Sequence, residues 1–576
     1  MSDVLSDGDS HGAVSAYLER TQTAGKPANA AEPAVRALLD DLVADNPVIA
    51  TALGLTAGAD RLPSWSADAV ARRAVMLHHH ERQLLPLLAD PDTDTAVDAF
   101  AGLQIVRRLL RNVELAETHR RRPGAYLDVL FGLFPLLVRE LGSIDERLEA
   151  LAGRLSAAPG LLEEARENLE PGLPLVFVQA GLDSVDGLLE LAGPTVRSFA
   201  VSAGRGGALD VASQAACAAL ERFRDHLRDH LQPMAVAECG AGRALLDDVL
   251  RWEHVLDEPP EALAAYGREV LADTKARMEE LATGLGHADA AAAVSAIQAD
   301  TPAPADLVAA YRSAVEVARA FVVEHGIATL PSGEELAVVA TPPFLRRMLP
   351  FAAYDQPGPY AERQLGFYYV TPPREGLSGA DLVLAMRSHP RASLLTTGVH
   401  EAYPGHHLQL VSANLAPTLA RRIAHLASGG NILIEGWAFY CEELMEQEGF
   451  LADAAVRLMR LNDQVWRACR VVIDVELHLG VMDLPAAVDF LSSEAHMNRY
   501  EAELECRRYA EEPGQAMSYL LGKREVLRLA DVCRRERPGS LRGFHDELLS
   551  WGSLPPAVIA WGMGVGPRPA AAQLSS

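Results

Sequence analysis

The sequence is short of basic residues: 52 lysines and arginines stand against 78 acidic residues, which gives a net charge of −26. Nucleic acids and anionic membranes attract basic surfaces, so this balance argues against either as a partner. Long apolar runs are also lacking. The strongest, residues 129–138, has about half of the ~20 residues that a membrane-spanning helix needs. We predict that it forms a buried helix.

Two further signals are missing from the chain. Residues 1–30 lack the basic head and apolar core of a secretory signal, so we expect a cytoplasmic protein. The six cysteines are scattered without CxxC spacing, which favours reduced thiols in the core over disulfides or a cysteine-bound metal.

Pro-, Gly- or Ser-rich linkers and repeats of 30 to 50 residues are absent, which argues against several autonomous domains and against a solenoid. We therefore predict a single domain over residues 31–565. Residues 1–30 are expected to form a disordered tail and residues 566–576 a flexible one.

Apolar residues recur with helical spacing through most of the chain, as in residues 35–43 and 100–110. Residues 335–340 and 365–370 differ, because they are short, β-prone and bounded by Pro or Gly. The sequence predicts a mostly α fold: a large helical structure with a cleft and a small β-sheet that lines it.

The densest group of polar residues is the segment from His400 to Gln409, which reads HEAYPGHHLQ. In an HExxH helix, two histidines one turn apart bind a metal and the glutamate activates its water. Here Pro404 occupies the place of the second histidine. A break at Pro404 and Gly405 that absorbs two residues would bring His406 into that place, while His407 stays an alternative. The competing interpretation is three histidines flanking a helix that proline breaks.

A third ligand is offered by Glu435, in the segment NILIEGWAFY. Two histidines and one carboxylate, with one position left for water, suit a hydrolytic zinc site. We therefore predict one Zn²⁺ per chain, bound by His400, His406 and Glu435, with Glu401 as the base. The alternative for Glu435 alone is an exposed carboxylate at a helix start.

With these motifs the chain resembles the bacterial family of domain of unknown function 885, whose hallmarks are HExxPGHHxQ followed by EGWAxY. Further matching stretches are RPGAY at 122–126, PGLL at 159–162, TPPFLR at 341–346, and residues 508–519. The resemblance implies a helical zinc metallopeptidase-like fold with its site on the floor of a cleft. It also implies that Tyr509, beside Arg508, donates a hydrogen bond to the oxyanion, with Tyr519 as the fallback. A buried Tyr509 with another partner is the alternative.

Other residues could support such a site. Asp474 and His478 lie one helical turn apart. They could orient the metal ligands by hydrogen bonds, or they could form a purely structural pair. Tyr369, on an expected strand, could help to hold an extended substrate by main-chain pairing. The tract His78–His80 is interpreted as a solvated helix face, because consecutive histidines on a helix point in different directions.

The sequence thus predicts a zinc-dependent hydrolase that acts on a small peptide or amide substrate. Two alternatives stay open: a metal-dependent amide hydrolase or tailoring enzyme of a biosynthetic pathway, and a non-catalytic binding protein with a helical cleft. The oligomeric state is left open.

Overall fold

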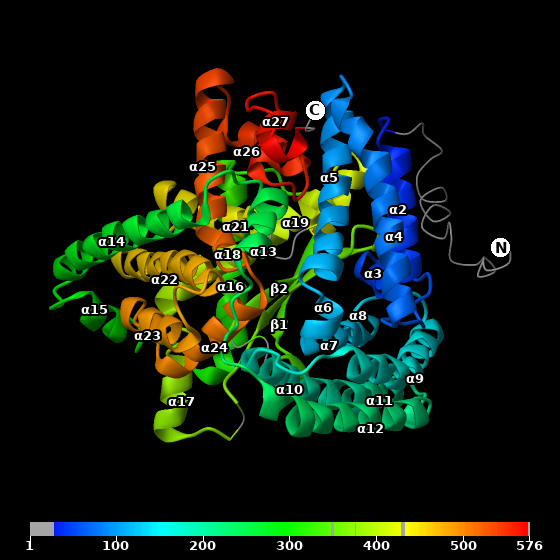
Figure 1. Cartoon of the computed structure of the whole chain (residues 1–576). Coiled ribbons are helices and arrows are strands. Elements are labelled where there is room, and N and C mark those ends of the chain that lie inside the picture. Colours follow the sequence, from blue (N-terminus) through cyan, green and yellow to red (C-terminus); the bar gives the residue numbers. More distant parts are fainter. Residues whose placement is uncertain (1–27, 347–348, 350, 375, 428–431, 574–576) are drawn as a thin grey trace.

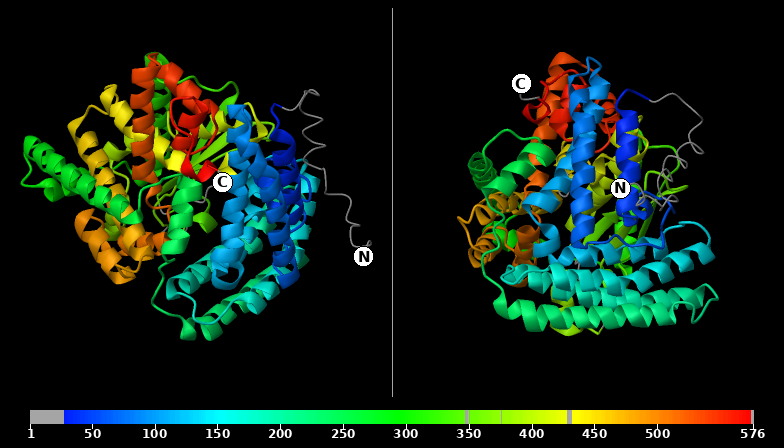
Figure 2. Two further views of the ribbon diagram at one scale, coloured as in Figure 1. Left: turned by 45° about the horizontal axis from the view of Figure 1, so that its top comes forward. Right: turned by 45° about the vertical axis from the view of Figure 1, so that its right-hand side comes forward.

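The structure is a computed structural model that describes residues 28–346, 349, 351–374, 376–427 and 432–573 (Figures 1 and 2). Almost all of the expected tail 1–30 lies outside these residues. Helices dominate, which confirms the mostly α prediction. The helices before the sheet are α2 (Glu32–Asp45), α3 (Val48–Ala52), α4 (Ala67–Leu84), α5 (Thr93–Leu110), α6 (Thr118–Arg121), α7 (Pro123–Phe131), α8 (Leu133–Val138), α9 (Ile144–Asn168), α10 (Leu175–Glu190), α11 (Val196–Ser202), α12 (Asp210–His226), α13 (Arg243–Val249), α14 (Pro260–Gly284), α15 (Ala290–Ile297) and α16 (Leu307–His325).

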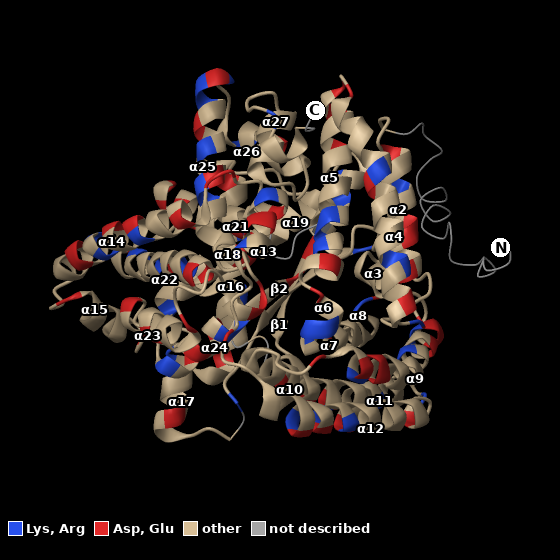
Figure 3. Cartoon of the chain, viewed as in Figure 1, with Lys and Arg blue, Asp and Glu red and all other residues tan. Residues whose placement is uncertain are grey.

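The helices after the sheet carry the motifs. They are α17 (Gly379–Met386), α18 (Arg391–Glu401), α19 (His406–Asn414), α20 (Leu419–Arg422), α21 (Ile432–Gln447), α22 (Ala454–His478), α23 (Leu484–Glu494), α24 (Arg499–Glu511), α25 (Ser518–Glu536), α26 (Leu541–Ser550) and α27 (Pro556–Gly562). Figure 3 shows acidic and basic residues interspersed along surface helices such as α14 and α25.

A three-stranded sheet lies near the middle of the molecule in the view of Figure 1. Its order is β1 (Glu334–Ala340), β3 (Gln364–Val370), β2 (Ala352–Asp355). The central strand β3 pairs in parallel with β1 and antiparallel with β2. The two predicted strands are confirmed, whereas the four-residue β2 was missed.

Three hydrophobic clusters form the core of the described chain. One of them joins residues from both ends, including Val35 of α2 and Ala572. Part of the expected flexible tail is therefore packed: Ala571 and Ala572 are buried, and Arg568 donates to the carbonyl of Ala572.

Two smaller predictions need correction. The apolar run 129–138 spans two helices, α7 and α8, rather than one. In the histidine tract, the half-exposed His78 lies between Glu81 and Glu114, whereas His80 is buried and its Nε2 lies 2.7 Å from Asp41. The cysteine prediction is confirmed: all six are free and five are buried.

Helix packing sets the positions of the motif residues. Helix α18 contacts α16, α21 and α22, while α25 runs along α21. The crossing of α21 and α25 is unusually close, because a Cβ atom on Gly436 or Gly522 would overlap the backbone of the other helix. The residues beside these glycines, on both helices, are thereby held near one another.

Candidate metal centre

The helix that carries His400 is broken where the sequence predicts. Helix α18 ends at Glu401, the N–H of Gly405 donates to the carbonyl of Val399 (3.0 Å), and α19 begins at His406. Pro404 has no N–H to continue the helix. A Cβ atom on Gly405 would overlap the carbonyl oxygen of His400, so glycine is required at this turn.

This break brings His400 and His406 to Glu435, with ligand atoms that all lie within 4.8 Å of one another. The Glu435 Oε2 atom is 3.7 Å from Nε2 of His400 and 3.4 Å from Nε2 of His406. That oxygen is buried and has no hydrogen-bond partner among the described residues. Two imidazole nitrogens and an orphaned carboxylate oxygen in one place are donors that zinc prefers, so these residues fit the ion. We call them the metal trio.

His407 points away from the trio. Its Nε2 lies 2.8 Å from Glu334 of β1, and its Nδ1 is 3.0 Å from the hydroxyl of Tyr354 on β2. Of the two histidines that the sequence left open, the structure thus places His406 with His400, and it places His407 against the sheet.

Glu442 orients His400 from behind. Its carboxylate is buried and lies 2.7 Å from Nδ1 of His400. This hydrogen bond at Nδ1 orients the ring so that Nε2 faces Glu435. Burial opposes a charge on His400, but Glu435 and Glu442 outweigh it and raise its pKa to about 10. In turn, both histidines hold the pKa of Glu435 well below its usual value against the effect of burial.

The EGWAxY motif is explained by three contacts. Gly436 permits the close crossing with α25. The indole Nε1 of Trp437 donates to the carbonyl of Pro404 (2.7 Å), which ties α21 to the turn between His400 and His406. The hydroxyl of Tyr440 pairs with Nε2 of the buried His545 (3.0 Å). The motif therefore fixes Glu435 relative to the histidine segment.

Glu401, the predicted base, directly follows His400 and is partly exposed. Its carboxylate has no hydrogen-bond partner within the described part of the chain. Burial, and after it the charge of Glu401, raises the pKa of Tyr311 on α16. An unpaired carboxylate next to the trio is free to accept a proton.

Tyr509 is not available as predicted. Its buried hydroxyl donates to Glu505 (2.7 Å) and accepts from Arg470 (2.8 Å) and Trp466 (2.9 Å). Arg508 also binds Glu505 (2.8 Å). This corrects the assignment of Tyr509 as oxyanion donor, because a fully engaged hydroxyl has no hydrogen to give to a substrate.

Tyr519, the fallback, lies at the trio. Its ring stacks on that of His400, with 6.2 Å between the centroids. Its hydroxyl has no partner among the described residues. Burial and the charge of Glu435 raise its pKa, so the phenol keeps its proton at neutral pH.

Asp474 and His478 do not contact the trio. Asp474 accepts the N–H groups of Gly514 and Met517, both at 2.9 Å, just before α25 begins at Ser518. His478 Nε2 lies 3.1 Å from the carbonyl of Tyr509. The pair therefore fixes the turn that leads into Tyr519.

Tyr369 cannot hold a substrate by main-chain pairing. It lies on the central strand, where it is buried and pairs with Val339 on one side and with Ala353 on the other. In this sheet the open strand edges belong to β1 and β2.

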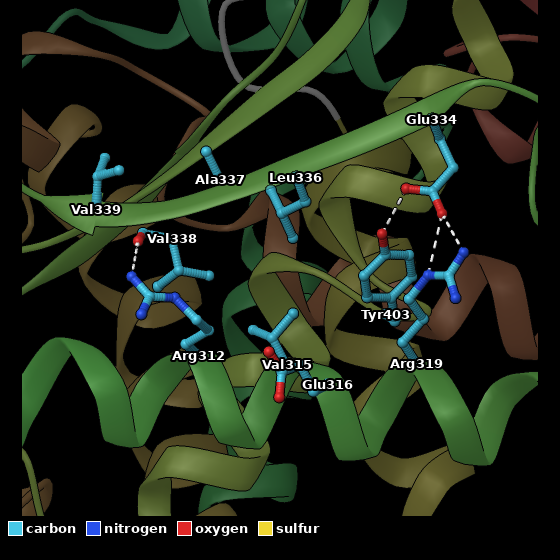
Figure 4. A pocket seen from close by; sticks show the side chains of 10 residues that line it. All are labelled: Arg312, Val315, Glu316, Arg319, Glu334, Leu336, Ala337, Val338, Val339 and Tyr403. Carbon is cyan, nitrogen blue, oxygen red and sulfur yellow. Dashed lines mark hydrogen bonds and ion pairs between the residues drawn. The ribbon is translucent and has the colours of Figure 1, made fainter.

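A pocket of about 440 Å³ lies between β1 and α16 (Figure 4). No residue of the trio lines it, but Tyr403, from the turn between His400 and His406, does. In Figure 4 the carboxylate of Glu334 joins Tyr403 to Arg319 of α16. Glu334 thus holds both Tyr403 and His407.

Sequence reasoning missed Glu442 and Glu334. The signal for Glu442 is its position two turns after Glu435 on one helix, which places both on the same face. Glu334 gives no such signal, since only the folded sheet brings it to His407.

Two solved structures share this fold. One is described as "putative lipoprotein of unknown function from Shewanella oneidensis"; it is 20% identical, covers 93% of this chain and 100% of its own, and has a TM-score of 0.76. The other, "putative lipoprotein from Colwellia psychrerythraea", is 18% identical, covers 92% and 98%, and has a TM-score of 0.78. No curated protein matches the chain.

These neighbours contradict the expected cytoplasmic location, because a lipoprotein is held at a membrane by its lipid. The expectation rested on N-terminal composition alone. Among the described helices, none combines the length and apolarity that crossing a membrane requires.

Residues 47–563 match the family "Bacterial protein of unknown function (DUF885)". The match includes the histidine segment 400–409, the EGWAxY motif and the sheet. The chain therefore belongs to the bacterial DUF885 family.

Proposed function

We propose that this protein is a zinc-dependent hydrolase of peptide or amide bonds. The observation that carries the proposal is the convergence of His400, His406 and Glu435, with a buried carboxylate oxygen that lacks any hydrogen-bond partner among the described residues. A zinc ion bound there would lower the pKa of a coordinated water and polarise a carbonyl group.

The side chains around the trio supply the remaining roles. Glu401 accepts the proton of the attacking water and passes it to the leaving amine. Tyr519 donates its phenolic hydrogen to the oxyanion, a role that its stacking on His400 and its unpaired hydroxyl support. Glu442 keeps Nε2 of His400 facing the metal position.

The first test is the metal content of untagged protein purified without added metal, measured by mass spectrometry beside Glu435→Ala. We expect about one zinc per chain, lost in the variant. Absence of metal from the wild type, even after reconstitution with zinc, would overturn the proposal.

The second test is a peptide and acyl-amide library with wild type and Glu401→Gln. The variant should keep its metal and lose turnover by about 100-fold or more, because it lacks the base. Equal turnover by both proteins would remove Glu401 from the mechanism.

A further inference from the structure

Three arginines lie around Tyr519. Arg470 and Arg467 of α22 place their guanidinium carbons 4.5 Å and 5.6 Å from the centre of the Tyr519 ring. Together with Arg508 of α24, they counter the effect of burial on the pKa of Tyr519. Since Tyr519 stacks on His400, this arginine cluster lies within a few extended residues of the metal trio.

Nearby carboxylates do not neutralise the cluster. Glu505 pairs with both Arg470 (2.9 Å) and Arg508 (2.8 Å). Asp463 lies 3.4 Å from Arg467. In the described chain, therefore, two carboxylates pair with three guanidinium groups.

The cluster also has unused donors. Nη1 of Arg470, a side chain that is only 3% exposed, is buried without a hydrogen bond among the described residues. Nε of Arg467 is likewise buried without a hydrogen bond, and its Nη1 has only the 3.4 Å ion pair with Asp463. A buried N–H donor without an acceptor is costly, and each such donor in a native protein needs an explanation.

We propose that Arg467, Arg470 and Arg508 bind a carboxylate of the substrate. The planar fork of a guanidinium group matches a carboxylate, which accepts two parallel hydrogen bonds. The substrates are then peptides or N-acyl amino acids with a carboxylate close to the scissile bond, either terminal or on an acidic side chain. This assignment of substrate class rests on the proposed function, but the binding itself requires no hydrolysis.

The test is binding of N-acetylphenylalanine, compared with its amide, to the full chain by calorimetry. Titrations use protein stripped of metal by a chelator, so that no metal can hold the carboxylate, and zinc-loaded protein. We expect the acid to bind at least about tenfold more tightly than the amide. The α-amide of N-acetylglutamic acid distinguishes a side-chain carboxylate from a terminal one, and preference for either carboxylate supports the proposal.

Variants test whether the arginine cluster causes the preference for the acid over the amide. Arg467→Gln should reduce it to less than about threefold, whereas Arg534→Gln, an exposed arginine on α25, should leave it unchanged. Arg508→Gln, at a half-exposed side chain, repeats the test if Arg467→Gln does not fold.

Equal affinity for acid and amide, no binding of either acid, or a preference that survives in both variants would overturn the proposal. If the protein as purified binds no zinc and turns over no substrate but still prefers the acid, the hydrolase is rejected and the carboxylate site is kept.

Discussion

The Nδ1 atom of His400 lies 2.7 Å from the buried carboxylate of Glu442, two helical turns after Glu435 on the same helix. One face of α21 thus provides both a ligand of the proposed metal and the group that orients another ligand. The same residue pair leads to the first prediction.

Glu442→Gln should weaken zinc binding by about 10- to 100-fold without loss of the fold, because an amide holds the imidazole less firmly than a carboxylate. The measurement is competition with a chelator of known affinity. Glu448→Gln, at an exposed position just after α21, is the control and should bind zinc as the wild type does. Unchanged affinity in Glu442→Gln would show that the pairing is only structural.

Tyr519→Phe should lower turnover, whereas Tyr509→Phe should lower the stability of the fold. Loss of the Tyr519 hydroxyl should lower kcat by about 100- to 1000-fold with little change in stability, since it has no partner in the described chain. Loss of the Tyr509 hydroxyl removes one hydrogen-bond partner from each of Glu505, Arg470 and Trp466 and should cost about 1–3 kcal/mol of stability. Turnover and denaturant unfolding of both variants separate the roles; the reverse pattern would restore Tyr509 as donor.

Gly436→Ala should destabilise the protein by about 1–3 kcal/mol, because the added methyl group meets the backbone of Gly522. Gly160→Ala, inside α9 with open space around the new Cβ, should instead stabilise by about 0.5–1 kcal/mol. Denaturant midpoints measure both. Similar effects of the two substitutions would mean that the helix crossing relaxes freely.

His545 should make stability depend on pH. Burial lowers its pKa to about 4, below the ordinary value of 6.5. Between these values the unfolded chain binds a proton that the folded chain does not, so the contribution of His545 is lost as the pH falls from about 6.5 to 4.

Relative to His545→Gln, the wild type should therefore lose about 2 kcal/mol of stability between pH 7 and pH 5. Unfolding curves of both proteins at the two pH values give this difference. A constant difference between them would assign the pH dependence to other groups.

The approach of His406 to His400 could be predicted from the sequence because its cause is local. Pro404 and Gly405 predict a break in the helix, whereas the choice between His406 and His407 needed the structure. Strands β1 and β3 could also be predicted, because their residues are β-prone. The four residues of β2 are too few to show a pattern.

Contacts between distant helices could not be predicted. Arg508 and Tyr509 are adjacent in sequence, but the partners that occupy the Tyr509 hydroxyl include Arg470 and Trp466 on α22. Likewise, the position of Tyr519 beside His400 depends on the close approach of Gly436 and Gly522, which no single segment reveals.

The metal trio also has a consequence for the chain as a polymer. His400 and His406 are separated from Glu435 by the whole segment that holds α20, so an ion shared by them would act as a cross-link that closes a loop. Such a link removes conformations from the unfolded chain and favours the folded one. The ion would then stabilise the tertiary structure as well as take part in the reaction.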